Sequence, residues 1–470
     1  MEHSLIIGGQ RVSPEATFDV INPATGQVIA RCPQGSVQDL DAAVAAARAA
    51  LPVWSSTPDA ERVAALQKIA ALIEANADEL AALITSEQGK PTAGPGAPFE
   101  VGGAVAWTQV TAGLPMGVET LIDTPEERVE VHREPVGVVA SITPWNWPLM
   151  IAIWHIMPAL RAGCTVVCKP SPYTPLATLR LGALIAEAGI LPEGVLNMVT
   201  GDAEVGDAIS GHEGIDKIVF TGSTATGRRI MQRAGASLKR LTLELGGNDA
   251  GIILPGTDMA PRLEALFWGA FINAGQTCSC LKRLYVHRDD YDGLVDQFAA
   301  YLAGIKVGAG DQPDTLIGPL SNAMQFEKVC AIVDDARAKG ARIVTGGQPL
   351  GQGYLYPLTL IANATLGMRV VDEEQFGPVL PVIVYDDLEQ AIAAANGLDL
   401  GLGASVWGDD PEAAAQIAKR LVAGTRWVNR HGVLNPTVPM GGVKQSGIGI
   451  EFGPEGLREY TTTQVLSIAK

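Results

Sequence analysis

The chain has 470 residues, of which 47% are hydrophobic and 18% charged, and its formal net charge is -17. Because a chain this long and apolar can bury large cores, the composition excludes a mainly disordered protein and predicts two or three domains. So acidic a surface also disfavours nucleic acid, whose phosphate backbone is bound through Lys and Arg.

Membrane and secretion signals are the next features to examine. The most apolar stretch, residues 149–160, is interrupted by His155 and Pro158 and is shorter than the roughly 20 apolar residues that a membrane span needs. The first residues lack a basic segment followed by an apolar core, so we expect no secretory signal. The six cysteines are too sparse for a disulfide framework. We therefore expect a cytoplasmic protein that does not bind membranes.

The first half of the chain alternates between helical and extended patterns. Two Ala-rich stretches, 41–51 and 59–88, are helical in pattern. Further strands are predicted at 136–142, 165–168, 195–199, 217–220 and 241–245, and further helices at 149–161, 175–188 and 224–233. This alternation predicts a mostly parallel sheet with helices on both faces, which binds ligands at the carboxyl ends of its strands.

A second alternating block begins near Ala250. It contains predicted helices at 261–271, 291–304, 388–395 and 411–421, and predicted strands at 283–287 and 380–385. The loop 273–280 lies between the blocks, where a cleft between two α/β domains is a natural active site. Residues 128–132 alternate polar and apolar side chains, which predicts a strand of a small third element.

Cys278, in the loop sequence Gly275-Gln276-Thr277-Cys278, is a candidate nucleophile. The alternative is a structural role, since most free cysteines are small buried hydrophobic residues. A metal site is not expected, because the Cys278-x-Cys280 pair lacks a second pair at zinc-ligand spacing.

Glu244 and Asn146 are the next candidates. Glu244 closes an apolar strand, where burial raises the pKa of a carboxyl, as a general base requires. A strand-end Glu can instead pair with an Arg or with water. Asn146 lies in a loop with two prolines and two tryptophans and offers amide donors to an oxyanion, although an Asn there can also cap a helix.

Three further segments are candidates for binding a dinucleotide. The Gly222-Ser223 turn joins a strand to a helix and can hold a phosphate, although no G-x-G-x-x-G fingerprint is present. Lys169 ends a strand and can reach a ribose or phosphate, or be solvated. Glu374 and Phe376 can bind a ribose diol and contact a nicotinamide ring, or cap a loop.

Over nearly its whole length the chain resembles the aldehyde dehydrogenase superfamily. The motifs that carry the resemblance occur in the order of that family: Val20-Ile21-Asn22-Pro23-Ala24-Thr25-Gly26, Pro144-Trp145-Asn146, Lys169-Pro170, Gly222-Ser223, Glu244-Leu245-Gly246-Gly247, Gly275-Gln276-x-Cys278, Glu374-x-Phe376-Gly377-Pro378 and Gly441-Gly442-x-Lys444-x-Ser446-Gly447. The resemblance implies an α/β fold with a Rossmann-type dinucleotide domain (1–116 and 135–246), an α/β catalytic domain (247–446) and a small β oligomerisation arm (117–134 and 447–470). It also implies a homodimer or homotetramer.

The resemblance implies a role for each motif residue. Cys278 would be the nucleophile, Glu244 the general base and Asn146 the oxyanion donor. The cofactor would contact Trp145, Lys169, Ser223, Leu245, Glu374 and Phe376, and the substrate pocket would include Trp147, Trp154, Thr277, Ser279 and His431. The implied reaction is NAD(P)-dependent oxidation of an aldehyde, through a thiohemiacetal and a thioester of Cys278, to a carboxylic acid.

Two departures from the pattern of the family bear on cofactor and substrate. Pro172 stands where many NAD-preferring relatives carry a Glu, so we expect NAD, with NADP as the alternative. Trp154 stands where enzymes for acidic semialdehydes tend to carry an Arg, which favours a hydrophobic or aromatic aldehyde. Trp147 and Trp154 resemble part of the aromatic cage of betaine aldehyde dehydrogenases, but His431 replaces the third aromatic residue.

Two other functions remain open from the sequence. A dehydrogenase that passes its acyl group to coenzyme A is one, although such relatives usually lack the Glu found here at position 244. A non-enzymatic dinucleotide-binding protein is the other, and the presence of Cys278, Glu244 and Asn146 together argues against it.

Overall fold

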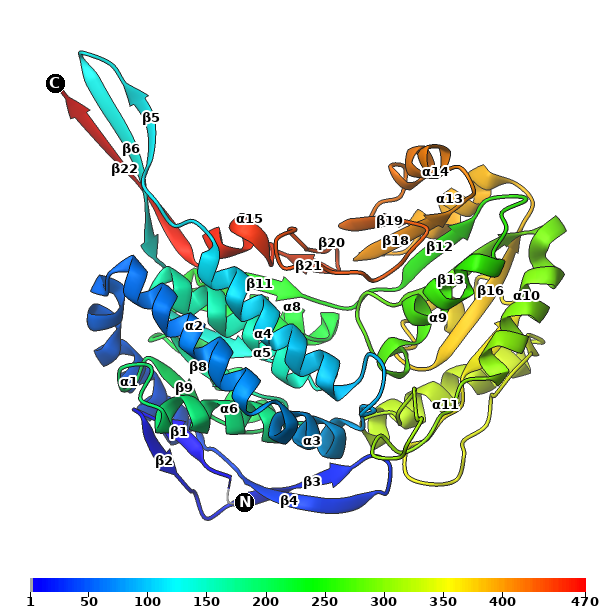
Figure 1. Ribbon diagram of the computed structural model, residues 1–470, viewed down its shortest axis with the longest axis horizontal. Coiled ribbons are helices and arrows are strands. Elements are labelled where there is room, and N and C mark those ends of the chain that lie inside the picture. The colour runs from blue at the N-terminus through cyan, green and yellow to red at the C-terminus, as the bar shows by residue number, and fades with distance from the viewer. Residues whose placement is uncertain (1–2) are drawn as a thin grey trace.

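Two sheets, one in each half of the molecule, organise the chain (Figure 1). The computed structural model describes residues 3–470. No helix within that range is both long and apolar enough to span a bilayer. The division into two α/β halves and a projecting β arm confirms the predicted fold class.

The first domain is built on an eight-stranded sheet of order β2-β1-β9-β8-β7-β10-β11-β21. The five central strands, β9 to β11 in this order, are parallel, and the strands at both edges are antiparallel. The strands are β1 (Leu5–Ile7), β2 (Gln10–Val12), β7 (Val138–Ile142), β8 (Thr165–Lys169), β9 (Leu196–Met198), β10 (Lys217–Thr221), β11 (Arg240–Glu244) and β21 (Gly447–Ile448). The predicted parallel strands are thus neighbours in one sheet.

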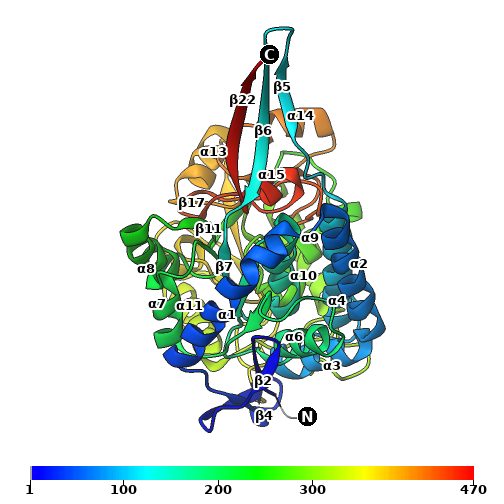
Figure 2. The same cartoon turned by 90° about the vertical axis from the view of Figure 1, so that its left-hand side faces the viewer.

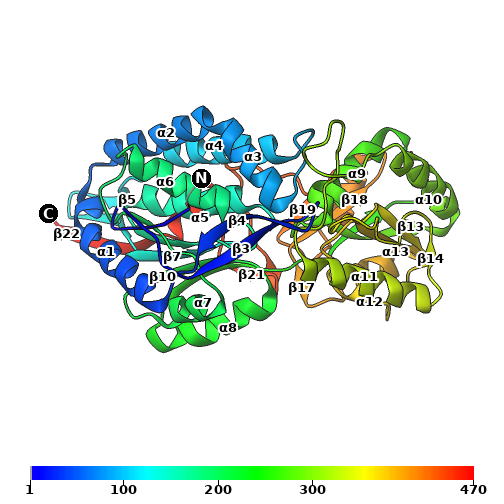
Figure 3. The same cartoon turned by 90° about the horizontal axis from the view of Figure 1, so that it is seen from below.

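Helices cover both faces of this sheet, as Figure 3 shows from below. One face carries α1 (Val37–Ser56), α7 (Ala203–Gly211) and α8 (Thr224–Ala234), followed by the 3-10 helix η1 (Gly235–Ser237). The other carries α2 (Asp59–Ala75), α3 (Ala77–Gln88), α4 (Ala97–Gly113), α5 (Pro148–Ala162) and α6 (Leu176–Glu187).

The single helix predicted over residues 59–88 is two helices, α2 and α3, separated by Asn76. The Asn76 side chain donates from Nδ2 to the carbonyl of Leu72 at 2.8 Å. Such a bond from side chain to backbone competes with helix continuation, and it explains why an otherwise continuous helical pattern breaks there.

The second domain contains a seven-stranded sheet of order β14-β15-β16-β13-β12-β18-β19, in which only β14 is antiparallel. Its strands are β12 (Asp249–Ile253), β13 (Leu281–His287), β14 (Arg342–Ile343), β15 (Thr359–Ala362), β16 (Val379–Tyr385), β18 (Gly403–Trp407) and β19 (Thr425–Val428). One face packs on η2 (Ala260–Arg262), α9 (Leu263–Phe271) and α10 (Arg288–Ala303), the other on α11 (Ala323–Ala338), α12 (Arg369–Asp372), α13 (Leu388–Asn396) and α14 (Pro411–Ala418).

A three-stranded antiparallel arm of order β22-β6-β5 projects from the first domain (Figure 2). Its strands are β5 (Glu119–Asp123), β6 (Glu127–Pro135) and β22 (Thr461–Ala469). Residues 447–460, which the resemblance assigned to the arm, lie on the first domain instead. There β21 pairs with β11, and Leu457 and Tyr460, in and just after α15 (Gly453–Arg458), are buried in the main core.

Two small sheets complete the fold. The hairpin of β3 (Thr17–Asn22) and β4 (Gln27–Pro33) runs below the first domain in Figure 1 and reaches the second. The carbonyl of Pro23, in its turn, accepts from the backbone N–H of Tyr354 in the second domain at 2.8 Å. The pair β17 (Leu400–Gly401) and β20 (Val443–Lys444) is antiparallel and joins the C-terminal segment to the second domain.

Candidate active site

The first sheet contributes the carboxyl ends of its strands to the candidate site, and the second sheet contributes the amino ends. Asn146, Lys169, Ser223 and Glu244 lie at or just after the carboxyl ends of the parallel strands β7, β8, β10 and β11. The candidate residues of the second domain instead precede their strands: Cys278 comes just before β13, and Glu374 and Phe376 just before the neighbouring strand β16. The topology therefore brings residues from distant parts of the sequence to one region where the two domains meet.

The loop that carries Cys278 has an unusual backbone. Asn273 and Ala274, in η3 (Ile272–Gly275), both have positive φ angles, of 53° and 55°. Gly275 has a φ of +70°, and a Cβ there would collide with the carbonyl of Gly377, so only glycine fits. Backbone strain of this kind is common at functional sites. It leaves the Cys278 side chain half-buried at the end of the loop.

The loop after β7 is hydrogen-bonded to the loop of Cys278. Asn146 donates from Nδ2 to the carbonyl of Gln276 at 2.8 Å, and its own carbonyl accepts from Asn273 Nδ2 at 2.7 Å. Trp147 donates from Nε1 to Thr277 Oγ1 at 2.9 Å. The structure therefore brings Asn146, Trp147 and Thr277 together around the nucleophile candidate.

A buried ion pair that was not identified from the sequence is hydrogen-bonded to the loop of Asn146. Lys90 and Glu100 are fully buried and paired, and Lys90 Nζ also donates to the carbonyl of Asn146 at 2.7 Å. The ammonium lies 3.5 Å from the centroid of the Trp147 ring. Burial lowers the pKa of Lys90 to about 8, although Glu100 acts in the opposite direction. No local pattern in the sequence distinguishes these residues from solvated charges.

Glu244 is a buried carboxyl with an exposed fraction of only 4%. Within residues 3–470, neither of its oxygens accepts a short and well-aligned hydrogen bond. Burial raises the pKa of Glu244 well above its usual range and the neighbouring Glu451 raises it further, while the backbone N–H of Gly442 lowers it. Glu451, also missed from the sequence, lies 3.3 Å from His155 Nε2. The raised pKa is what a general base at the end of an apolar strand requires.

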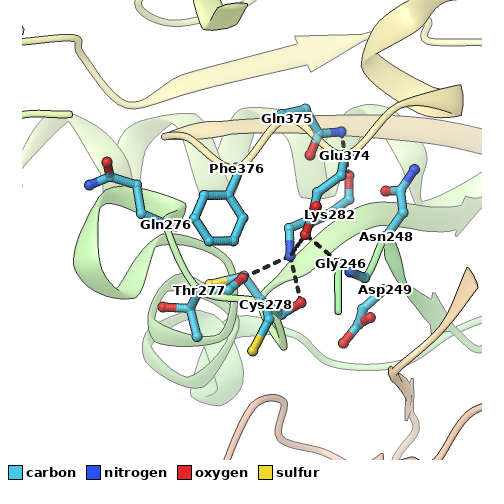
Figure 4. A network of polar contacts seen from close by, with 12 residues as sticks. Gly246, Asn248, Asp249, Gln276, Thr277, Cys278, Lys282, Glu374, Gln375 and Phe376 are labelled. Carbon is cyan, nitrogen blue, oxygen red and sulfur yellow. Dashed lines mark hydrogen bonds and ion pairs between the residues drawn. The ribbon is translucent and has the colours of Figure 1, made fainter. Parts of the chain in front are cut away.

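Burial raises the pKa of the Cys278 thiol to about 12. The carboxylates of Glu244, Glu374 and Asp249 raise this pKa too, whereas the ammonium of Lys282 lowers it. Lys282, in β13, is another residue that sequence reasoning missed, since a lone Lys in a strand carries no motif (Figure 4).

The candidate cofactor residues of the second domain lie beside this thiol. Glu374 Oε1 accepts from the backbone N–H of Gly247 at 3.1 Å. Phe376 has a positive φ of 53°, and its ring meets that of Trp145 edge-on at a centroid distance of 5.4 Å. Leu245, which follows β11 of the first domain, is buried, and its backbone N–H donates to the carbonyl of Ser446 at 2.8 Å.

The candidate cofactor residues of the first domain lie at two strand ends. Ser223 caps α8, where its Oγ accepts from the backbone N–H of Thr226 at 3.3 Å, so the first N–H groups of an eleven-residue helix face the turn. Lys169 is buried, and burial lowers its pKa to about 8, although Asp202 opposes the change. A Cβ on Gly246 would lie 2.7 Å from Glu374 Oε2 and 3.6 Å from Thr224 Oγ1. Gly246 therefore lies close to both the start of α8 and the side chain of Glu374.

An aromatic cluster forms one wall beside Cys278. Trp154 packs against Trp107 and Phe452 with centroid distances of 5.5 and 4.7 Å. Trp147, Met150, Ile151, Leu402, Met440 and Leu434 belong to the same apolar cluster, and Cys278 packs against it. Trp107 and Phe452 were not foreseen, because they come from α4 and from the C-terminal segment and belong to none of the motifs.

His431 and Ser279 are both buried in the second domain. His431 is buried, with Nδ1 2.9 Å from Ser405 Oγ and Nε2 3.4 Å from Asp249 Oδ2, and its ring packs on Trp427. The Ser279 hydroxyl is buried without a partner among the described residues. The polar contacts of His431 therefore lie within the second domain and not with Trp147 or Trp154.

Comparison with known proteins gives a consistent result. Residues 11–466 match the model of the aldehyde dehydrogenase family. The phenylacetaldehyde dehydrogenase of Pseudomonas fluorescens is 40% identical over 485 residues, which cover 100% of this chain and 96% of that protein. An NAD+ complex of the aldehyde dehydrogenase of Bacillus cereus has a TM-score of 0.96 at 38% identity, covering 100% of this chain and 97% of that one. The betaine aldehyde dehydrogenase of Staphylococcus aureus with NAD+ has a TM-score of 0.95 at 35% identity, covering 99% and 94%.

These matches span the chain from end to end and agree with the order of the motifs, with both sheets and with the arrangement of the cleft. The chain belongs to the aldehyde dehydrogenase family.

Proposed function

We propose that this protein oxidises an aldehyde to the carboxylic acid, with Cys278 as nucleophile, Asn146 as oxyanion donor, Glu244 as general base and NAD as hydride acceptor. The observation that carries the proposal is the meeting of three groups in one cleft: a half-buried thiol, an amide fixed against the loop of that thiol, and a buried carboxyl without a hydrogen-bond partner among the described residues. Family membership supports the reaction class.

The residues along the cleft fit a dinucleotide. The Ser223 turn offers the N–H groups of a helix N-terminus to a pyrophosphate, and Lys169 offers a cation at the end of β8, two strands away in the same sheet. Glu374 would bind the nicotinamide ribose, and Phe376, with Trp145, would border the ring. NAD+ complexes of two structural relatives support NAD. When bound, the cofactor supplies the hydride acceptor.

The first half of the reaction takes place at Cys278. The thiol gives its proton to the ionised Glu244 carboxylate, which passes it on to solvent, and the thiolate forms a C–S bond to the carbonyl carbon of the aldehyde, whose oxygen becomes an oxyanion. An amide carries two N–H donors. Because Asn146 uses one on Gln276, the other is left for the oxyanion, together with a backbone N–H of the loop. The oxyanion then reforms its C=O bond, the hydride leaves from the same carbon, and a thioester remains on Cys278.

The second half of the reaction depends on Glu244. In its ionised form the carboxylate takes a proton from a water molecule, whose oxygen attacks the thioester carbon. The C–S bond then breaks, the electron pair returns to sulfur and the carboxylic acid leaves. The presence of Glu244 favours this hydrolysis over transfer of the acyl group to coenzyme A.

The substrate that best fits the cleft is a hydrophobic or aromatic aldehyde. The wall of Trp107, Trp154 and Phe452 offers apolar faces and edges, which suit a phenyl ring or an alkyl chain. The sequence identity of 40% between this chain and a phenylacetaldehyde dehydrogenase supports this substrate class. A quaternary ammonium aldehyde is the second candidate, because three aromatic rings in contact can also hold a cation.

The experiment measures the absorbance of the reduced cofactor with a panel of aldehydes. Each aldehyde is tested with NAD and with NADP, in the presence and absence of coenzyme A. We expect phenylacetaldehyde and hexanal to give a higher kcat/KM than betaine aldehyde and succinic semialdehyde, with NAD preferred and with no requirement for coenzyme A. Absence of cofactor reduction with every aldehyde would contradict the proposed function.

A further inference from the structure

Lys282 is a buried ammonium in the candidate site to which the proposed reaction gives no role. Its side chain is 3% exposed and lies at the start of β13, four residues after Cys278. Lys282 Nζ donates to the carbonyl of Thr277 at 2.8 Å and to that of Cys278 at 2.7 Å (Figure 4). It also lies 3.3 Å from Glu374 Oε1. These three contacts use all three donors of an ammonium group.

Apart from Lys282, the charged groups that act most strongly on Cys278 are negative. Glu244, Glu374 and Asp249 each disfavour the thiolate, and burial disfavours it most. Within residues 3–470, Lys282 is the only cation among the groups that act most strongly on this thiol.

Lys282 keeps its charge in this environment. Burial alone would lower the pKa of its ammonium, but Glu374 first, then Cys280, Asp249 and Cys278, together hold this pKa above the usual lysine value. The network therefore favours an ammonium that is hydrogen-bonded to the backbone of the nucleophile itself.

We propose that Lys282 is the positioning residue of the nucleophile: its ammonium fixes the Thr277 and Cys278 carbonyls and supplies the positive charge that favours the Cys278 thiolate. The inference rests on the proposed function, in which Cys278 is the nucleophile. A neutral amide can replace the hydrogen bonds of Lys282 but not its charge, so the two contributions are separable by substitution.

The test is the rate at which iodoacetamide alkylates Cys278 between pH 6 and pH 10, without cofactor or aldehyde. Peptide mass spectrometry distinguishes Cys278 from Cys280. Lys282→Met and Lys282→Gln should each lower the rate at pH 8 about tenfold, as expected when a thiol pKa rises by about one. Lys282→Arg should stay within about twofold of the wild type, since its charge is retained.

Lys217→Met is the matched control, because Lys217 is also a buried lysine of a parallel strand. It lies at the start of β10, where its Nζ donates to Thr242 Oγ1 at 2.6 Å, at the opposite end from the candidate site. Its alkylation profile should equal that of the wild type.

A wild-type profile for folded Lys282→Gln would overturn the proposal, since Lys282 would then act only as a donor to the two carbonyls. An equal loss of rate in Lys217→Met would overturn it too. The proposed function fails by a different result, namely retention of aldehyde-dependent cofactor reduction by Cys278→Ser.

Discussion

At the scale of single residues, the acid–base behaviour of the site centres on Glu244 and Glu451. As a general base, Glu244 must be ionised, and its raised pKa means that the ionised form appears only as the pH rises well above the usual carboxyl range. Removal of the neighbouring negative charge lowers that pKa. Glu451→Gln should therefore move the acidic limb of the kcat profile to lower pH, by about one unit. Glu455→Gln, exposed in the same segment, is the control and should leave the limb where it is.

The two cysteines of the loop give a second prediction. Cys278 packs against the aromatic cluster at the cleft, whereas Cys280 is 1% exposed and its Sγ faces the carbonyl of Ile272 at 3.9 Å. Cys278→Ser should abolish turnover, because a serine hydroxyl without its own base does not form the covalent intermediate. Cys280→Ser should retain most of the activity. If the Cys280 variant is the inactive one in a steady-state assay, Cys278 is not the nucleophile.

Residues within motifs could be identified from the sequence, and residues that act on them from a distance could not. Asn146, Glu244 and Cys278 each stand in a short pattern with a chemical meaning. Lys282 and Glu451 become visible only in three dimensions, because a lone charge in a strand or loop has no periodic or spacing signal. Their contacts with the site depend on how β13 and the C-terminal segment pack.

At the scale of elements, the Lys90–Glu100 pair links the end of α3 and helix α4 to the loop of Asn146. Lys90→Met leaves Glu100 buried without its partner and should destabilise the protein by about 3–5 kcal/mol. It also removes a donor from the Asn146 carbonyl, so kcat should fall more than KM rises. Urea unfolding and steady-state kinetics measure both effects.

The double variant Lys90→Met/Glu100→Gln is the control for the buried charge. It should recover part of the lost free energy of unfolding, because a neutral Gln can still accept a hydrogen bond from Leu149 or Met150 at the start of α5. A single variant as stable as the wild type would show that the pair does not hold this loop in place.

The five parallel strands of the first sheet and most of the helices that cover it were predictable, because each of these has a clear apolar period bounded by turns. The break at Asn76 was not, since it arises from one side-chain bond within a continuous helical pattern. Helix α4 was missed for a different reason. Its sequence is rich in Gly, Ala and Val, and all but a few of its polar residues are buried or half-buried, so it has no distinct polar face.

At the scale of the whole molecule, the arm exposes apolar side chains that include Leu121, Ile122, Val465 and Leu466. Such a patch on a projecting sheet predicts coverage by a second copy of the chain. Val465→Glu should therefore shift the protein toward a smaller species in size-exclusion chromatography with light scattering. Val53→Glu, at an equally exposed apolar site on α1, should not. A monomeric wild type would contradict the prediction.

The meeting of the two domains was inferred from the position of the Cys278 loop between the two alternating blocks, and the structure agrees with it. The contribution of the C-terminal segment was not inferred. Residues 440–452 bring Met440, Glu451 and Phe452 to the site as the chain passes from the second domain back to the first. The motif Gly441–Gly447 lies in this segment but does not reveal the return to the first domain, which depends on the pairing of β21 with β11.

The most direct test of the account is a single-turnover measurement on Glu244→Gln with NAD and a reactive aldehyde. Loss of the general base should slow steady-state turnover by about 10²–10⁴-fold, while the first turnover still gives a burst of reduced cofactor. Mass spectrometry of the quenched enzyme should then find one acyl group, on Cys278. A Glu244→Gln enzyme with wild-type steady-state rates and no acyl group on Cys278 would contradict the account.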